Sequence, residues 1–219
     1  MVLNLNNYVE LIALLIALIF YKDLARHNFF IYFIPFLAVT SIIEIYAIGK
    51  ERPFKNVMYN YFQLFQYVFY TALFYKNLHF PKSKKIVLYS FPLFLIFFLT
   101  NIFFVYGPYE YNNYTSILGS FFIVIFICMH FYEAIIPQTS QVKLFASPFF
   151  WVAVGLLFFK LGSVIMFAMF KFLSSIDLQN KGVVIFQTII KSLNVILYGS
   201  LSVAFILCRN NKKTSSSPS

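Results

Sequence analysis

The chain has 219 residues, of which 61% are hydrophobic and 22% aromatic, while only 11% are charged, and its formal net charge at pH 7 is +10. A soluble domain is roughly 25% charged, so this composition excludes an ordinary soluble protein, and the apolar content excludes a disordered one. Two cysteines are too few for a disulfide framework or a cysteine-rich metal site. The basic residues lie in short clusters between apolar blocks, so the expected partner is the lipid bilayer and not nucleic acid.

Seven apolar blocks follow one another along the chain, most of them near the roughly 20 residues that a membrane-spanning helix needs. They cover residues 8–21, 29–48, 57–75, 86–106, 114–136, 148–172 and 183–207. Lipid-exposed backbone must satisfy its own hydrogen bonds, and the blocks lack the alternating pattern of a barrel, so we expect helices. The sequence therefore predicts an all-α polytopic membrane protein. It has one seven-transmembrane-helix bundle over 1–208 and a polar, disordered cytoplasmic tail over 209–219.

Lysine and arginine are unevenly divided between the two sets of loops. With the N-terminus outside, the residues at the inner face are Lys22, Arg26, Lys76, Lys82, Lys84, Lys85, Lys143, Arg209, Lys212 and Lys213. The residues at the outer face are Lys50, Arg52, Lys55, Lys171 and Lys181. Cytoplasmic loops carry the excess of basic residues. We therefore expect the N-terminus outside and the C-terminus inside, in a cell membrane such as the bacterial inner membrane.

Polar and ionisable residues inside the predicted spans are candidates for function, because they are costly in lipid. In chain order they are Glu10, Glu44, Asn60, Gln63, Gln66, Asn101, Lys160, Lys191 and Asn194. They converge on the centre and outer half of the predicted bundle. Lys160 lies about 18 Å into its span, too deep to reach water easily. We expect Lys191 to pair with Glu44, and Lys160 to face the amide stripe of Asn60, Gln63 and Gln66 or an anionic ligand.

Two interpretations of these polar residues in the centre and outer half of the bundle remain open. It predicts either an outward-facing pocket for a small anionic or zwitterionic ligand, or polar bridges that only fix helix packing. A pocket suits a receptor-like sensor that passes a helix shift to a cytoplasmic or membrane signalling partner. The alternative is a transporter of a small solute or lipid. An intramembrane enzyme is a further alternative, but the sequence assembles no nucleophile, base or metal, and we assign no catalytic residue.

Neither a metal nor a cofactor is predicted. His130 and Glu133 lie three residues apart on the fifth span, but two ligands do not complete a metal site, which leaves a proton relay as the alternative. Lys191 resembles the Schiff-base lysine of retinal-binding proteins. The carboxylate counter-ion that such proteins need is missing from the third span, where Gln63 and Gln66 stand.

The most distinctive run covers residues 147–162 and reads SPFFWVAVGLLFFKLG. Ser147 can cap a helix and Pro148 suits its first turn. Gly155 and Gly162 share one face and allow close helix contact. Together with NVILY at 194–198, this run resembles uncharacterised small bacterial seven-helix membrane proteins. The resemblance covers the last two spans best, and it implies the seven-helix fold but no activity.

Overall fold

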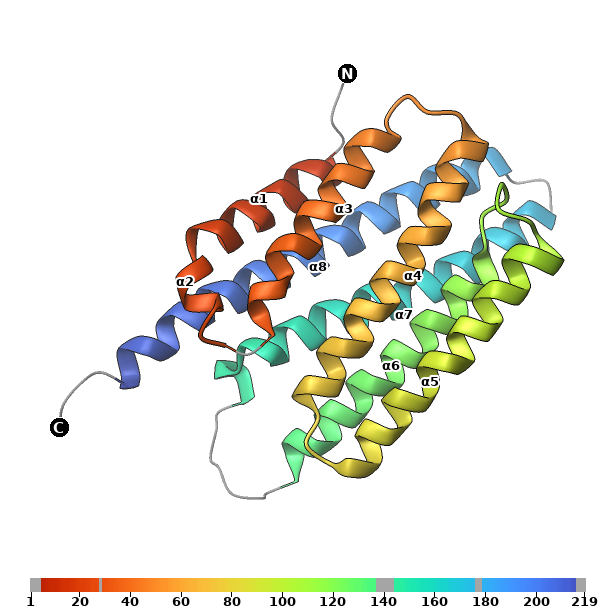
Figure 1. The fold of residues 1–219 in the computed structure, drawn as a ribbon. Helices are drawn as coiled ribbons and strands as arrows, with labels where there is room; N and C mark the ends of the chain where they lie inside the picture. Colours follow the sequence, from red (N-terminus) through yellow and green to blue (C-terminus); the bar gives the residue numbers. More distant parts are fainter. Residues whose placement is uncertain (1–4, 28, 137–143, 176–178, 216–219) are drawn as a thin grey trace. The chain divides into compact units, whose positions relative to one another are not determined.

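The computed structural model describes residues 5–27, 29–136, 144–175 and 179–215, and every element in these ranges is helical (Figure 1). The expected all-α fold is confirmed for this part of the chain. The α-helices are α1 (Leu5–Ile19), α2 (Tyr21–Leu24), α3 (Phe33–Ala47), α4 (Arg52–Asn77), α5 (Pro81–Thr100), α6 (Asn113–Ile135), α7 (Pro148–Ser175) and α8 (Gln179–Ser215). Short 3-10 turns cover Phe30–Tyr32 and Leu144–Ala146, and a π-helical turn, Asn101–Val105, extends α5.

Within the described ranges, five helical segments are long and apolar enough to cross a membrane. They are Phe30–Ala47, Pro81–Val105, Asn113–Ile135, Pro148–Phe167 and Thr188–Arg209. These segments indicate a multi-pass membrane protein. The other two predicted spans, 8–21 and 57–75, lie on α1 and α4, and neither helix is both long and apolar enough. The 15 residues of α1 extend about 22 Å, less than the roughly 30 Å of a hydrocarbon core. Amides and tyrosines make the 26-residue α4 less apolar.

The helix ends follow local sequence signals. α4 and α5 each begin with proline in the first turn, where its missing N–H costs no hydrogen bond. Asn112 caps α6, since its side-chain oxygen accepts a hydrogen bond from the Thr115 N–H at 3.2 Å. Gly49 after α3 and Gly107 after the π-helical turn have φ values of 79° and 74°, which favour glycine.

The C-terminal end of α8 differs from the sequence expectation. The sequence predicts a disordered tail from Arg209, whereas α8 continues as a helix to Ser215. Adding a residue to an existing helix costs far less than starting one, and arginine and lysine favour helix. The polar sequence after Cys208 can therefore continue the helix that the apolar residues before it begin.

Contacts divide the chain into two compact units. Unit 1 consists of Met1–Ile45, Pro137–Phe159 and Thr188–Ser219. In it, the rings of Phe33 on α3 and Phe205 on α8 meet edge to face, with centroids 5.7 Å apart. A Cβ atom on Gly155 of α7 would lie 2.7 Å from the Cβ of Ser200 on α8. The expected close contact at Gly155 is therefore confirmed.

Unit 2 consists of Tyr46–Ile136 and Lys160–Gln187. Its helices α4, α5 and α6 lie side by side, and each contacts the other two (Figure 1). The core is aromatic: the rings of Tyr67 and Phe94 stack with centroids 3.7 Å apart, and the Tyr67 hydroxyl donates to the Ser90 hydroxyl oxygen at 3.0 Å. Gly119 of α6 makes room for this stack, because a Cβ atom there would lie 2.9 Å from the Phe94 ring.

Candidate functional site

The nine predicted site residues divide between the two units. Glu10, Glu44, Lys191 and Asn194 belong to unit 1, and Asn60, Gln63, Gln66, Asn101 and Lys160 belong to unit 2. The two groups differ in how many of their polar side-chain atoms make hydrogen bonds within the chain.

In unit 1, Glu10 is the centre of a small oxygen-rich cluster. Its side chain is 2% exposed, and its Oε1 accepts a hydrogen bond of 2.9 Å from the Ser41 hydroxyl on α3. Glu44, one turn further along α3, lies close enough to interact electrostatically with Glu10. One turn before Glu10 on α1, the Asn6 side-chain oxygen is buried without a hydrogen-bond partner in the described residues. Two carboxyl groups therefore share a largely buried environment.

Lys191 and Asn194 lie on α8 in the same unit, both half-buried. Their spacing of three places them on one face of the helix, as expected. The pairing of Lys191 with Glu44 stays a prediction.

In unit 2, Asn60 holds the turn between α5 and α6. Its amide nitrogen donates to the carbonyl oxygens of Pro108 at 3.1 Å and Glu110 at 2.8 Å, and its side-chain oxygen accepts from the Asn112 N–H at 2.9 Å. Asn56, one turn earlier on α4, donates to the Tyr109 carbonyl oxygen at 2.9 Å. The amide of Asn60 is fully used inside the chain, and its role here is to fix the Pro108–Asn112 turn.

Asn101 also bonds to its own backbone. Its amide nitrogen donates to the Phe97 carbonyl oxygen at 2.8 Å, and its own carbonyl oxygen accepts from the Tyr106 N–H at 2.9 Å. These bonds stabilise the π-helical turn that ends α5. Gln66 is half-buried on α4.

Lys160 is 8% exposed on α7, and its ammonium nitrogen lies 5.4 Å from the centroid of the Tyr70 ring on α4. The sequence predicted that this lysine faces the amide stripe of α4. Tyr70 is seven residues beyond Gln63 and lies on the same face of the helix. The structure therefore places Lys160 against that face, two turns further along it than Gln63.

A second contact fixes the direction in which α7 runs along α4. The ring of Phe167 on α7 packs on Tyr111, with centroids 6.0 Å apart, and Tyr111 lies in the turn that Asn60 holds. Gln63 thus lies between Asn60 and Tyr70 on α4. Ser163, 6% exposed, lies between Lys160 and Phe167 on α7. Along its own helix, Gln63 on α4 and Ser163 on α7 each lie between these two contacts.

Gln63 differs from the other amides of unit 2. Both polar atoms of its side chain are buried, and neither has a hydrogen-bond partner among the described residues. A buried polar group without a partner costs about 1–3 kcal/mol. A carboxamide can donate to an anion and accept from an ammonium or hydroxyl group. With the Lys160 ammonium two turns away, this part of α4 has the chemistry to receive a small anionic or zwitterionic group.

The sequence alone did not single out Tyr70 or Ser163, although it contains signals for both. Ser163 follows Lys160 at helical spacing, and Tyr70 follows Gln63 at two turns. The sequence also did not show the role of Glu133. Both carboxylate oxygens of Glu133 accept backbone hydrogen bonds from the α4–α5 turn, one from the His79 N–H at 2.6 Å and the other from the Phe80 N–H at 3.2 Å.

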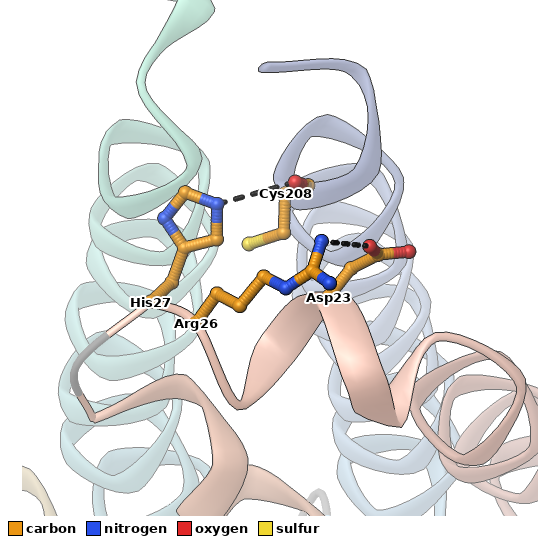
Figure 2. Close-up of polar contacts among 4 residues, drawn as sticks. All are labelled: Asp23, Arg26, His27 and Cys208. Carbon is orange, nitrogen blue, oxygen red and sulfur yellow. Dashed lines mark hydrogen bonds and ion pairs between the residues drawn. The ribbon is translucent and has the colours of Figure 1, made fainter. Parts of the chain in front are cut away.

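A further polar group that the sequence did not predict lies at one end of unit 1. Figure 2 shows His27, on the connection between α2 and α3, with its Nε2–H donating to the Cys208 carbonyl oxygen on α8 at 3.2 Å. Beside it, Arg26 and Asp23 form an ion pair of 3.8 Å. The guanidinium of Arg209 lies 5.4 Å from the Phe20 ring centroid. The His27 hydrogen bond ties the α2–α3 connection to α8, and the Arg209 contact ties α8 to Phe20, which precedes α2.

A cavity of about 350 Å³ in unit 2 has a different character from the predicted polar pocket. Apolar side chains of α5, α6 and α7 line it, among them Phe97, Phe121 and Leu161, with Tyr114 at one end. None of the nine predicted site residues lines this cavity.

Comparison with known proteins assigns the chain to no group. No family model, no curated protein and no solved structure matches it. Evidence for function therefore comes from the geometry of the chain itself.

Proposed function

We propose that this protein is a receptor-like, multi-pass membrane protein that binds a small anionic or zwitterionic ligand in unit 2, between α4 and α7. Lys160 supplies the positive charge, and Gln63 and Ser163 supply hydrogen-bonding groups. The observation on which this depends is the buried amide of Gln63, whose two polar atoms have no partner in the described chain. A ligand group that bonds to this amide recovers the cost of burying it.

The proposal includes seven membrane crossings, with the N-terminus outside and the C-terminus inside. Each of the seven apolar blocks lies on a helix, which supports this count. We include α1 and α4 among the crossings because polar residues lie on the buried face of each helix: Asn7 and Glu10 on α1, and Asn60 on α4. In this orientation the Pro108–Asn112 turn is outside, and the ligand reaches Gln63 from that end.

α8 is the natural output element of such a receptor. It continues past its apolar part to Ser215, and His27 bonds to it at Cys208. A small shift of α8 would move a basic helical end on the cytoplasmic side, where a signalling partner can bind it.

The test uses the purified protein in lipid nanodiscs and follows its thermal unfolding with glutamate, glycine, succinate and inorganic phosphate as probes. We expect at least one probe to raise the unfolding temperature, because a ligand that binds the folded state stabilises it by mass action. Gln63→Leu should abolish this rise. Without a probe, the same variant should be at least as stable as the unchanged protein, because it removes an unsatisfied buried amide.

Gln66→Leu is the matched control, since it makes the same change one turn along α4. It should keep the response to the probe. The proposal is wrong if Gln63→Leu keeps the response. It is also wrong if Gln63→Leu lowers the stability of the ligand-free protein by more than about 1 kcal/mol, because the amide would then already be in use.

A transporter is the second candidate, and the Glu10–Ser41–Glu44 cluster favours it. Buried carboxyl groups inside a membrane bundle commonly move protons or cations. A transporter would carry the stabilising probe across the membrane of proteoliposomes, and Glu10→Gln would stop this flux while Gln63 still bound the probe. A receptor binds the probe without flux.

A further inference from the structure

Four lysines surround the turn that joins α4 to α5. Lys76 lies in the last turn of α4, and Lys82, Lys84 and Lys85 lie near the start of α5. Lys76, Lys82 and Lys85 are exposed. The ammonium nitrogen of Lys84 lies 5.7 Å from the centroid of the Tyr75 ring, which draws it against the side of α4. This end of unit 2 therefore presents concentrated positive charge.

No carboxylate neutralises these lysines within the part of the chain that the structure describes. The acidic residue at this end is Glu133, and its two oxygens accept the His79 and Phe80 N–H groups. Glu51 and Glu110 lie at the opposite end of unit 2, where α4 begins and where Asn60 holds the α5–α6 turn. None of the four lysines makes an ion pair with a described residue. Glu133 thus fixes the shape of the turn and leaves the ammonium groups available.

One exposed face of α5 continues from this charge into an apolar strip. Lys82 and Lys85 share a helix face with Ile86, Tyr89, Leu93 and Ile96. Tyr89 is 69% exposed, Leu93 56% and Ile96 64%. α5 belongs to a segment long and apolar enough to cross a membrane, so a face of this kind meets lipid. The distance along the helix from Lys85 to Ile96 is about 16 Å, which is roughly half of a hydrocarbon core and so matches one leaflet.

We propose that the α4–α5 turn and this face of α5 form a binding site for one anionic phospholipid. The phosphate lies between Lys82 and Lys85, with Lys76 and Lys84 adding to the positive field, and an acyl chain follows Tyr89, Leu93 and Ile96. Clusters of four or more lysines beside a membrane span attract anionic lipids in this way. An acidic peptide would meet the lysines but would leave the apolar strip unmatched. The lipid matches both parts of the surface. This proposal does not depend on the ligand site at Gln63.

The test measures binding of fluorescent phosphatidylglycerol and phosphatidylcholine to the full chain in a neutral detergent. We expect phosphatidylglycerol to bind more tightly than phosphatidylcholine. Lys82→Gln with Lys85→Gln should weaken phosphatidylglycerol binding roughly thirtyfold, the order expected for two surface lysines, and should leave phosphatidylcholine binding unchanged. Lys50→Gln with Lys55→Gln is the matched control at the other end of unit 2, and it should have no effect.

Two competitors separate the lipid from other anions. Inorganic phosphate and a polyglutamate peptide should displace phosphatidylglycerol weakly, because neither offers an acyl chain for the apolar strip. Leu93→Gln should weaken the binding of both lipids. The proposal is overturned if the two lipids bind equally well, if the control pair of lysines matters as much as Lys82 and Lys85, or if the peptide binds as tightly as the lipid.

Discussion

Asn60 and Gln63 show how two amides of similar appearance in the sequence acquire different roles. Both lie on α4, three residues apart. The side chain of Asn60 makes three hydrogen bonds to the backbone of the α5–α6 turn, whereas both polar atoms of Gln63 are buried without a partner in the described ranges. An amide whose polar atoms already make hydrogen bonds within the chain stabilises the structure. An amide whose polar atoms have no partner can bind a ligand.

The first prediction concerns Asn60. Asn60→Ala should lower the free energy of unfolding by about 2 kcal/mol, because it leaves two carbonyl oxygens and an N–H group without their partner. Asn60→Asp should be at least as harmful, because its carboxylate would face the carbonyl oxygens of Pro108 and Glu110. Thermal unfolding in detergent, followed by circular dichroism, measures both.

Gln66→Ala is the comparison for Asn60, since it removes a similar amide from the same helix. It should change stability by less than half as much. If Asn60→Asp is as stable as the unchanged protein, the three hydrogen bonds do not hold the turn.

The candidate residues of this site could be predicted, but their partners could not. Lys160 and Gln63 are recognisable because a lysine or an amide deep in an apolar block is costly. Tyr70 and Ser163 are ordinary residues in such blocks, and only the contact of Lys160 on α7 with Tyr70 on α4 draws attention to them. Helix pairing depends on side-chain packing between distant segments, which a single sequence does not specify.

At the scale of elements, the apolar blocks predicted where helices lie, and proline and glycine stand at several of the helix ends. Pro81 and Pro148 begin α5 and α7. Gly49 and Gly107, which both have positive φ, each follow a helical segment. The same patterns did not show that α5 ends in a π-helical turn, or that α8 continues to Ser215. Both depend on hydrogen bonding and helix propagation, to which hydrophobic periodicity is insensitive.

The second prediction compares two glycines in unit 1. Gly155→Ala should lower stability by about 1–3 kcal/mol, because its Cβ would lie 2.7 Å from the Ser200 Cβ and 3.3 Å from the Leu197 carbonyl oxygen. Gly199→Ala should be neutral or stabilising by up to about 1 kcal/mol, because nothing lies within 4 Å of that Cβ and alanine favours helix. Thermal unfolding of the two variants side by side measures the difference. Equal effects would contradict the close contact of α7 with α8.

At the scale of the whole molecule, the exposed surface indicates which solvent surrounds it. Phe103 is 70% exposed, Phe104 85% and Phe121 58%. Large aromatic side chains are rarely this exposed to water in such number. Surrounded by lipid, the same side chains lie in their preferred environment, and the buried polar residues become the expensive ones.

The third prediction concerns orientation. Single cysteines introduced at Lys50 and at Tyr109 should react with a membrane-impermeant maleimide in intact cells, because both lie in turns that the N-outside orientation places outside. A cysteine at His79 should react only after the membrane is opened. The labelling uses a background in which Cys128 and Cys208 are alanine. The opposite pattern would reverse the orientation without changing the fold.

The most direct test of the central claim, that lipid surrounds these helices, uses a cysteine that the chain already has. Cys128 lies exposed on α6, within the candidate span Asn113–Ile135, while Cys208 is buried. In Cys208→Ala protein kept in its membrane, Cys128 should not react with a water-soluble maleimide on either side, and it should react fully once the protein is denatured. A cysteine at Tyr109 in the same background confirms that the reagent works. Rapid labelling of Cys128 in the intact membrane would place this face of α6 in water and would contradict the account.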